Sequence, residues 1–544
     1  MELLSFTCSA GSRVCISTGI ILIKLKMDFL EGITPREYQQ KIFEICAKKN
    51  CLVVLPTGLG KTLIALMLAI QRMKDFPGEK VVFLAPTKPL AEQHQKSFKK
   101  YLPELFGEMT LFTGAVSPGN RKKLWQNSDI IFSTPQCVAN DVKKGLYDLG
   151  GVCLLIEDEA HRCVKSYDYT FLAQNYIKNS LHPRILGLTA SPGSDKSKIK
   201  DICKNLFIEA VELRTRESPD VKQYLQELEF EKIMVDFPPE FQEIKHVLLK
   251  LFDRYVEELR ARKVLFGPST KTGLIQLQKK LMHNLAIAGS NRNYNYMLGV
   301  SACAQAIKLQ HALELLETQT LQSFNKYLQK LFKEATNKKS KGVVKLVAKP
   351  EFNFIFMSSN ELLAKNQEHP KLSELIEIIK REKQQNKNLK MIVFTQFRDT
   401  ATNISKKINE IPDIKAKVFV GQAKKSESGL SQKQQKKIIE DFSDGKIDIL
   451  CATCIAEEGL DIPEVNAVVF YEPIPSAIRT IQRTGRTARL SKGKLIMLIT
   501  KKTRDEAFFY VSKSREKKMH SAISQIQQDL ENGKEFKSTQ RSLF

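Results

Sequence analysis

The sequence predicts an α/β protein with two parallel-sheet lobes and a mostly helical domain inserted between them. Short apolar runs alternate with helical patterns from residue 50 to 205, and the same alternation returns from about 370 to 510. Between these blocks, from about 215 to 365, apolar residues recur at helical spacing instead. A chain of 544 residues is long enough for three or four domains, at roughly 150 residues each.

Composition narrows the class of protein. The chain carries 85 Lys and Arg against 60 Asp and Glu, a net charge of +25, which favours a polyanionic partner, most often nucleic acid. A hydrophobic content of 42% excludes a disordered chain. The lack of an apolar run of about 18 residues predicts no membrane span and no membrane partner. Eleven cysteines are ordinary usage in a reducing compartment, and the isolated pair Cys451 and Cys454 is expected to be packed thiols rather than a zinc site.

The first lobe is expected over residues 27–214. Residues 1–26 are an uncertain extension, because Met27 begins a more ordinary start. Five apolar runs predict the buried strands of this lobe: CLVVLP, KVVFLAP, DIIFSTP, CLLIEDEAH and RILGLTASP. Each run stops at a proline, a glycine or an acidic residue, as the strands of a helix-covered parallel sheet do.

A phosphate-binding loop follows the first of these runs. Gly58 and Gly60 allow backbone N–H groups to turn toward phosphate oxygens, Lys61 would reach the β- and γ-phosphates, and Thr62 would ligate Mg²⁺. Leu55 stands where the general pattern has its first glycine, so the loop is of the P-T-G-x-G-K-T form. The expected nucleotide-binding residues of the loop are Pro56, Thr57, Gly58, Leu59, Gly60, Lys61 and Thr62.

Paired carboxylates follow the fourth run. Asp158 is expected to hold Mg²⁺ through water, while Glu159 orients and deprotonates the attacking water. His161 is expected to couple this site to the nucleic-acid side. The alternative is an exposed acidic turn after a strand, which the loop upstream disfavours.

Two further segments of the first lobe are candidates for the site. Arg36 and Gln39 precede the phosphate-binding loop, and the Gln39 amide could read an adenine edge, although a surface helix start would use the same residues. The hydroxyls of Thr189 and Ser191 follow the strand ILGL and could bridge the carboxylates to the second lobe.

The rest of the chain is divided at residues 365 and 520. The helical insert is expected over 215–365, with strand signals sparse until NFIFM. The second lobe covers 366–520, with strands predicted at KMIVFTQF, KAKVFVG, IDILCAT, AVVFYEP and LIMLIT, and a tail covers 521–544.

The second lobe also contributes nucleotide and catalytic candidates. Gly459 and Asp461 in GLDIP are expected to bind nucleotide. Gln482, Arg486 and Arg489 in QRTGRTAR are expected to be catalytic. Arg486 and Arg489 are three residues apart and share a helix face, so they could neutralise γ-phosphate charge in the transition state. An isolated basic helix would be the alternative.

Together these motifs resemble the superfamily 2 helicases of the DEAH type. The likeness covers about residues 34 to 490. It is most specific for the archaeal Hef and Fanconi anaemia M-type (FANCM/Mph) family, which the sequence resembles in the segments LPTGLGKT, FLAPTKPLAEQH, GLTASPGSD, VELRTRESPDV, HALELLETQ and HPKLSELIEII. The resemblance implies two RecA-like lobes and an ATP- and Mg²⁺-dependent DNA helicase or translocase. It also implies remodelling of forks and Holliday junctions in DNA repair and fork restart, usually with 3′ to 5′ polarity.

The resemblance also implies partners and a location. Expected DNA backbone contacts are Thr87, Lys88, Gly114, Thr134, Pro135, Thr395, Gln396 and Thr453, with the helical insert contacting duplex or junction. The XPF-type nuclease of many Hef proteins is not found, so cleavage is not expected. Gln540, Leu543 and Phe544 resemble the opening of a sliding-clamp-binding motif. The expected location is the cytoplasm of an archaeon, at the nucleoid, or a nucleus if the source is eukaryotic.

Two other functions remain open. A duplex-RNA-stimulated ATPase or RNA helicase of the Dicer-like branch would carry a helical insert at the same place. A non-catalytic, clamp-tethered scaffold would bind junctions with a degenerate ATPase, but Lys61, Asp158, Glu159 and Arg486 are all present.

Overall fold

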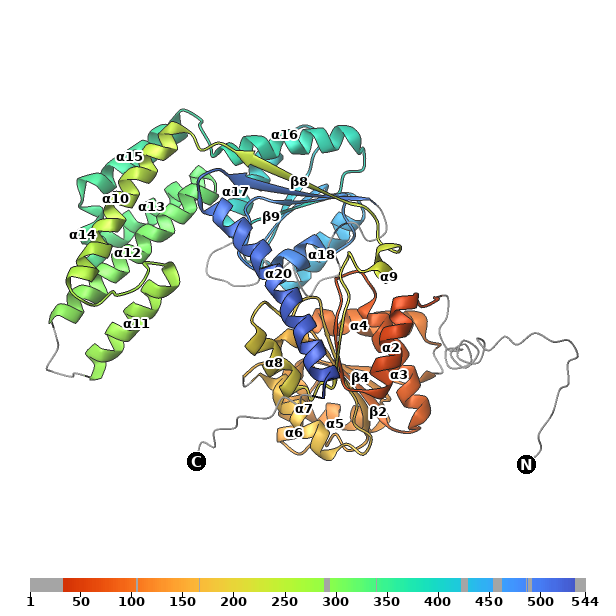
Figure 1. Cartoon of the computed structure of the whole chain (residues 1–544). Coiled ribbons are helices and arrows are strands. Elements are labelled where there is room, and N and C mark those ends of the chain that lie inside the picture. The colour runs from red at the N-terminus through yellow and green to blue at the C-terminus, as the bar shows by residue number, and fades with distance from the viewer. Residues whose placement is uncertain are drawn as a thin grey trace, which may run out of the picture. The chain divides into compact units, whose positions relative to one another are not determined.

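The chain divides into two compact units, Met1–Gln223 with Met519–Phe544 and Tyr224–Lys518. The computed structural model describes residues 33–103, 106–165, 167–287, 294–338, 340–421, 429–453, 462–485, 487 and 492–533. Each unit contains a parallel sheet, as Figure 1 shows along the coloured chain. The prediction of two parallel-sheet lobes and a helical domain is therefore confirmed.

The first unit is built on a seven-stranded sheet in the order β3-β4-β2-β5-β6-β1-β7. Its strands are β1 (Cys51–Val54), β2 (Lys80–Leu84), β3 (Met109–Phe112), β4 (Ile130–Ser133), β5 (Val152–Asp158), β6 (Ile185–Thr189) and β7 (Ala210–Leu213). Five of them are the five predicted runs. The two strands that sequence reasoning missed, β3 and β7, are the edge strands, and each has only two buried residues. Edge strands lack the continuous apolar pattern of a strand covered on both faces.

Helices cover this sheet, and their starts follow local sequence rules. They are α2 (Glu37–Lys48), α3 (Lys61–Asp75), α4 (Lys88–Tyr101), α5 (Pro118–Asn127), α6 (Pro135–Lys143), α7 (Asp168–Asn179), α8 (Lys196–Asn205) and α9 (Pro219–Lys222). Proline stands in the first turn of α4, α5 and α6, where its missing N–H costs nothing. Helix α3 is buried continuously from Leu63 to Arg72, which places the start of this helix rigidly against the sheet.

The second unit contains a six-stranded sheet in the order β10-β11-β9-β12-β13-β8. Its strands are β8 (Leu228–Val235), β9 (Met391–Phe394), β10 (Ala416–Phe419), β11 (Ile449–Ala452), β12 (Ala467–Phe470) and β13 (Gly493–Thr500). Strand β8 was not predicted, because none of its residues is fully buried and its charged residues hide the strand pattern. It pairs with β13 over eight residues. The insert therefore does not begin at 215: its helices follow the first strand of the second sheet.

A bundle of helices occupies the chain between β8 and β9. It comprises α10 (Pro239–Ala261), α11 (Lys271–Ile287), α12 (Tyr294–Thr318), α13 (Leu321–Thr336), α14 (Lys341–Val347) and α15 (Pro350–Ala364), which lie side by side in Figure 1. The segment NFIFM, expected as a strand, lies within α15. Phe352, Ile355, Ser359 and Leu362 are its buried residues, and this spacing of three and four is helical. The segment was therefore misread because a short apolar run fits either structure.

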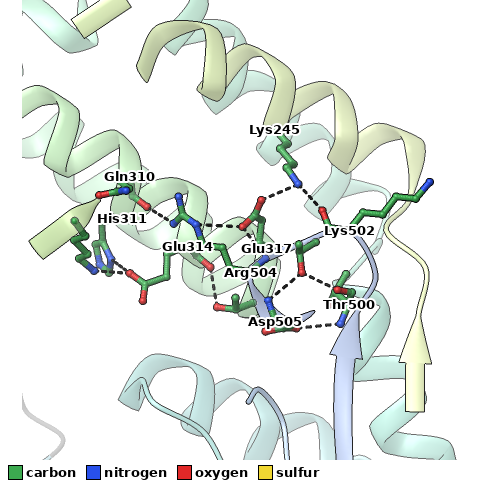
Figure 2. Close-up of polar contacts among 12 residues, drawn as sticks. Lys245, Gln310, His311, Glu314, Glu317, Thr500, Lys502, Arg504 and Asp505 are labelled. Carbon is green, nitrogen blue, oxygen red and sulfur yellow. Dashed lines mark hydrogen bonds and ion pairs between the residues drawn. The ribbon is translucent and has the colours of Figure 1, made fainter. Parts of the chain in front are cut away.

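Polar contacts join this bundle to the end of β13 and the start of α20 (Arg504–Glu531), as Figure 2 shows. Lys245 Nζ on α10 lies 2.8 Å from Glu317 Oε1 on α12 and donates to the carbonyl of Lys502 at 3.0 Å. Arg504 donates to the carbonyl of Gln310 at 2.8 Å. The bundle is thus fastened to its own unit by buried and half-buried polar groups.

The remaining helices complete the second unit. They are α16 (Pro370–Gln385), α17 (Arg398–Ile408), α18 (Gln432–Ser443), α19 (Ala477–Thr484) and the first half of α20. Helix α20 continues without a break through the expected boundary at 520, and its residues from Met519 onward belong to the first unit. In the part of the chain that the structure describes, no helix is long and apolar enough to cross a membrane.

Candidate active site

The phosphate-binding loop lies between β1 and α3, at the carboxyl end of the first sheet. Gly58 and Gly60 have φ values of 84° and 78°, in the left-handed region that glycine adopts without strain. A Cβ on Gly60 would lie 2.3 Å from the side-chain nitrogen of Gln39, so a larger residue would have to displace this amide and would also be strained at this φ. The first turn of α3 carries no acidic residue. Its N–H groups and dipole therefore favour an anion at this position.

Two side chains of α2 hold the loop against this helix, and a third contact lies beside the loop. The Tyr38 hydroxyl donates to the Leu59 carbonyl at 2.8 Å, and Gln39 Nε2 donates to the same carbonyl at 3.2 Å. The other end of the Gln39 amide accepts from the backbone N–H of Arg36 at 2.9 Å. Lys61 Nζ donates to the Leu55 carbonyl at 2.8 Å. Both ends of the Gln39 amide are thus bound within the chain, and reading of adenine by Arg36 and Gln39 stays a prediction.

The acidic motif begins where β5 ends. Asp158 and Glu159 are 5% and 8% exposed, and Glu159 has a φ of 51°, so the backbone turns sharply at this residue. His161 Nδ1 lies 3.1 Å from Glu159 Oε2 and 3.2 Å from Thr189 Oγ1 at the end of β6. The structure therefore brings together Glu159, His161 and Thr189, which the sequence singled out separately.

Asp158 is held by a histidine that sequence reasoning did not assign. His94 Nε2 on α4 lies 2.9 Å from Asp158 Oδ2, and His94 Nδ1 lies 3.4 Å from Thr62 Oγ1. Burial would raise the pKa of Asp158, but His94 and Lys61 outweigh it, so this pKa is lowered. The only sequence signal for His94 was its place in FLAPTKPLAEQH, because a single histidine in a helical segment does not by itself indicate a function.

These residues fit a nucleotide and Mg²⁺. Thr57 Oγ1 is buried in the loop and has no hydrogen-bond partner among the described residues, so a ligand could supply one. The Thr62 hydroxyl and the Asp158 carboxylate, both beside His94, are hard oxygen donors of the kind Mg²⁺ prefers. No group of three or more His, Cys, Asp and Glu residues able to hold a metal occurs among the described residues. A site completed by phosphates and waters does not need one.

The predicted DNA contacts differ in exposure. Thr87, Lys88 and Gly114 are exposed at the surface of the first unit, and Thr134 is half-buried. Pro135 is buried in the first turn of α6. These positions in the first unit stay predictions, with Thr87, Lys88 and Gly114 open to a backbone phosphate.

The corresponding residues of the second unit are mostly enclosed. Thr395 is 0% exposed, and its hydroxyl donates at 3.3 Å to Gln319 Oε1 and to Glu472 Oε1. The Thr395 side chain is thus enclosed in this structure, and its contact with DNA stays a prediction. Thr453 is 5% exposed and Gln396 is half-buried, with its backbone N–H donating to Glu472. Thr395 therefore has a structural place within the second unit.

Several candidates lie outside the described residues: Gly459, Asp461, Arg486, Arg489, Gln540, Leu543 and Phe544. Their nucleotide, catalytic and clamp-binding roles stay predictions. Gln482 is described, lies in α19 and is 2% exposed. Cys454 also lies outside, whereas Cys451 is buried and burial raises its thiol pKa.

Comparisons with known proteins agree with this arrangement. The profile described as DEAD/DEAH box helicase matches residues 36–199, and the one described as helicase conserved C-terminal domain matches residues 370–491. A third profile, described provisionally as the helical bundle of an ATP-dependent RNA helicase, matches residues 240–363. The three matches cover the first sheet except β7, the second sheet except β8 and β13, and the bundle.

Curated relatives match over most of this chain. MJ1505 of Methanocaldococcus jannaschii, named provisionally as an ATP-dependent RNA helicase, is 38% identical over 91% of this chain and 61% of its own length. The Fanconi anemia group M protein homolog of Mus musculus is 32% identical over 90% of this chain and 26% of its own. The ATP-dependent DNA helicase fml1 of Schizosaccharomyces pombe is 32% identical over 86% of this chain and 57% of its own. The chain thus spans about a quarter to three fifths of these relatives.

One solved structure is matched almost from end to end. The Hef helicase domain of Pyrococcus furiosus is 40% identical, with a TM-score of 0.67, over 88% of this chain and 98% of that domain. This likeness agrees with the order of the two sheets and the bundle along the chain and with the phosphate-binding loop (P-loop). The chain therefore belongs to the DEAD/DEAH-box helicases, in the family of the Hef helicase domain and its Fanconi anaemia M-type relatives.

Proposed function

We propose that this protein is an ATP-dependent DNA helicase or translocase that remodels branched DNA, such as replication forks and Holliday junctions, in repair and fork restart. The observation that carries the proposal is the convergence of the P-loop, the acidic motif and Thr189 at one end of the first sheet. The likeness to fml1 of S. pombe, which is named an ATP-dependent DNA helicase, supports DNA as the substrate.

The proposed chemistry assigns one role to each group of this site. Bound Mg²⁺, held by Thr62 and Asp158, would neutralise phosphate charge. Lys61 would exchange its bond with the Leu55 carbonyl for a phosphate oxygen. Glu159 would take the proton of the attacking water. His161, which lies between Glu159 and Thr189, would couple the ATP site to the nucleic-acid side. Arg486 and Arg489 would add positive charge in the transition state, and Gln482 would support them.

On the nucleic-acid side, we propose that exposed Thr87, Lys88 and Gly114 hold the DNA backbone without reading bases. The net charge of +25 supports such binding. The protein would act where the genome lies, in an archaeal cytoplasm or in a nucleus. Binding of a sliding clamp through Gln540, Leu543 and Phe544 is proposed on sequence alone.

A second function is favoured by two names. The profile matching residues 240–363 and the M. jannaschii relative are both named for RNA helicases. A duplex-RNA-stimulated ATPase would use the same first-unit site with a different bundle partner. The two functions share the ATP chemistry and differ in the nucleic acid that stimulates it.

The test is steady-state ATPase of the full chain with single-stranded DNA, duplex DNA, a fork, a four-way junction and duplex RNA, at one stated salt concentration. We expect the fork or the junction to stimulate most. Lys61→Ala should abolish stimulated turnover, and Lys96→Ala, an exposed position on α4, should not. Strongest stimulation by duplex RNA would replace the DNA proposal, and turnover retained by Lys61→Ala would overturn the site itself.

A further inference from the structure

His94 connects the two protein groups expected to bind the metal. Thr62 lies in the first turn of α3 and Asp158 is the last residue of β5, 96 residues further along the chain. His94 comes from a third element, α4. Its two ring nitrogens face opposite partners: Nε2 lies 2.9 Å from Asp158 Oδ2 and Nδ1 lies 3.4 Å from Thr62 Oγ1. A side chain that only filled space would not need both nitrogens at polar groups.

The ring is itself held firmly. His94 is 8% exposed, and its ring lies 4.3 Å from the ring of Phe83 on β2, centroid to centroid. Phe83 in turn packs against Phe98 and Phe132. Helix α4 therefore presents the imidazole from a packed aromatic layer, and this packing restricts the orientation of the ring together with the contact to Asp158.

Asp158 is fixed from a second direction as well. The Tyr169 hydroxyl donates to the backbone carbonyl of Asp158 at 2.7 Å, which holds the end of β5 in place. His94 takes one carboxylate oxygen, Oδ2, and so sets the rotation of the carboxyl group. A carboxylate that is oriented before the metal arrives loses less conformational freedom on binding it.

The contact with Thr62 is of a different strength. At 3.4 Å it is at the long end of hydrogen-bond geometry, whereas the 2.9 Å contact with Asp158 is well within it. Thr62 can therefore exchange His94 for a metal ion at little cost, while Asp158 keeps its partner. The histidine would remain beside the site as a support outside the metal's own ligands.

From this geometry we propose that His94 is a positioning residue for Mg²⁺: it orients Asp158, and loosely Thr62, for the metal that accompanies the nucleotide. The inference deepens the proposed function and rests on it, because it assumes that the P-loop site binds a metal-nucleotide complex. Partners of this kind typically contribute about 10- to 100-fold to metal affinity. His94 does not touch the reacting atoms and is not a catalytic residue.

The test measures metal binding apart from turnover. Fluorescent ADP is titrated onto the full chain in chelator, and then again across a range of Mg²⁺ concentrations. His94→Phe keeps the ring against Phe83 and removes both nitrogens. We expect it to raise the Mg²⁺ concentration for half-maximal effect by about 10-fold or more, with metal-free ADP affinity unchanged within about twofold. His94→Gln, which can donate and accept, should restore most of the loss, and Lys96→Ala should match the wild-type.

Each outcome decides a separate point. An unchanged or lower Mg²⁺ midpoint in His94→Phe would overturn the inference, the lower value meaning that the histidine obstructs the metal. Equal weakening of ADP binding with and without Mg²⁺ would make His94 a packing residue only and would also overturn it. If His94→Phe does not fold, His94→Leu gives the same comparison with a smaller side chain. If wild-type protein shows no Mg²⁺-dependent ADP binding, the proposed function fails before His94 is tested.

Discussion

The two units carry buried carboxylates at the carboxyl ends of similar parallel sheets, yet they use them differently. In the first unit Asp158 and Glu159 lie at a site whose partners come from a histidine, a threonine and the P-loop. In the second unit Glu472 and Asp505 are 0% exposed and are bound to backbone N–H groups and to a buried lysine. The first arrangement is set up for a ligand, and the second holds strands, bundle and α20 together.

Burial by itself therefore does not mark a functional carboxylate. Burial raises the pKa of Glu157 well above its ordinary value, and only the thiol of Cys163 opposes it, yet Glu157 is a core residue of β5. Its neighbour Asp158 is almost as buried but has a lowered pKa, because His94 and Lys61 lie beside it. Within β5, Asp158 therefore differs from Glu157 in having His94 and Lys61 beside its carboxylate, and not in its burial.

Of the changes considered, one that removes the carboxylate of Glu159 in the first unit should have the greatest effect. Glu159→Gln should lower ATP turnover by about 10²- to 10⁴-fold, because the amide cannot accept a proton from water. Nucleotide binding should persist, since the P-loop is untouched. Stimulated ATPase and fluorescent-ADP binding measure the two properties, with exposed Glu44→Gln on α2 as the matched control. Near-normal turnover would mean that another group is the base.

The next prediction concerns a buried ion pair of the second unit. Lys371 and Asp505 form an ion pair at 2.7 Å with both side chains 0% exposed, and Lys371 also donates to the Thr318 carbonyl. Lys371→Met should destabilise the second unit by about 3–5 kcal/mol, because it leaves Asp505 buried without its cation. Thermal and urea unfolding of the full chain measure this.

The double variant Lys371→Met/Asp505→Asn sharpens the same test. It removes the uncompensated charge and should recover most of the lost stability, so the two single changes should not add. Additive losses would show that the pair is not coupled. The exposed pair Lys407 and Glu410 gives the control, and Lys407→Met should cost less than about 1 kcal/mol.

The smallest expected effect is a pH dependence in the second unit. Burial raises the pKa of Glu472 from 4.5 to about 7, against the opposing charges of Lys371 and Arg483. Because the folded chain then binds the proton more tightly than the unfolded chain, stability falls as pH rises from about 4.5 through 7.

Glu472→Gln removes this titration while its oxygen can still accept from Gln396. It should therefore gain stability relative to the wild-type as pH rises, by up to about 3 kcal/mol at pH 8, and little at pH 5. Melting temperatures from pH 5 to pH 8 measure the difference, with exposed Glu410→Gln as the control. Parallel curves for Glu472→Gln and wild-type would contradict the prediction.

The sequence alone was sufficient to predict features that depend on residues next to one another in the chain. The strand before Pro56, the two left-handed glycines and Lys61 stand next to one another, so the P-loop and its helix follow from local backbone and phosphate chemistry. The central strands were predicted for a similar reason, since burial on both faces makes each a short, continuous apolar run.

Tertiary structure decided whatever depends on residues distant in the chain. Edge strand β8 lacks a buried run and is recognised only by its pairing with β13. Thr395 carries a hydroxyl group that could contact a phosphate, but Gln319 and Glu472 pack around it and enclose it. His94 meets Thr62 and Asp158 only because α4, α3 and β5 converge at one end of the first sheet. Hydrogen bonds between such segments have no local pattern, so only the folded chain reveals them.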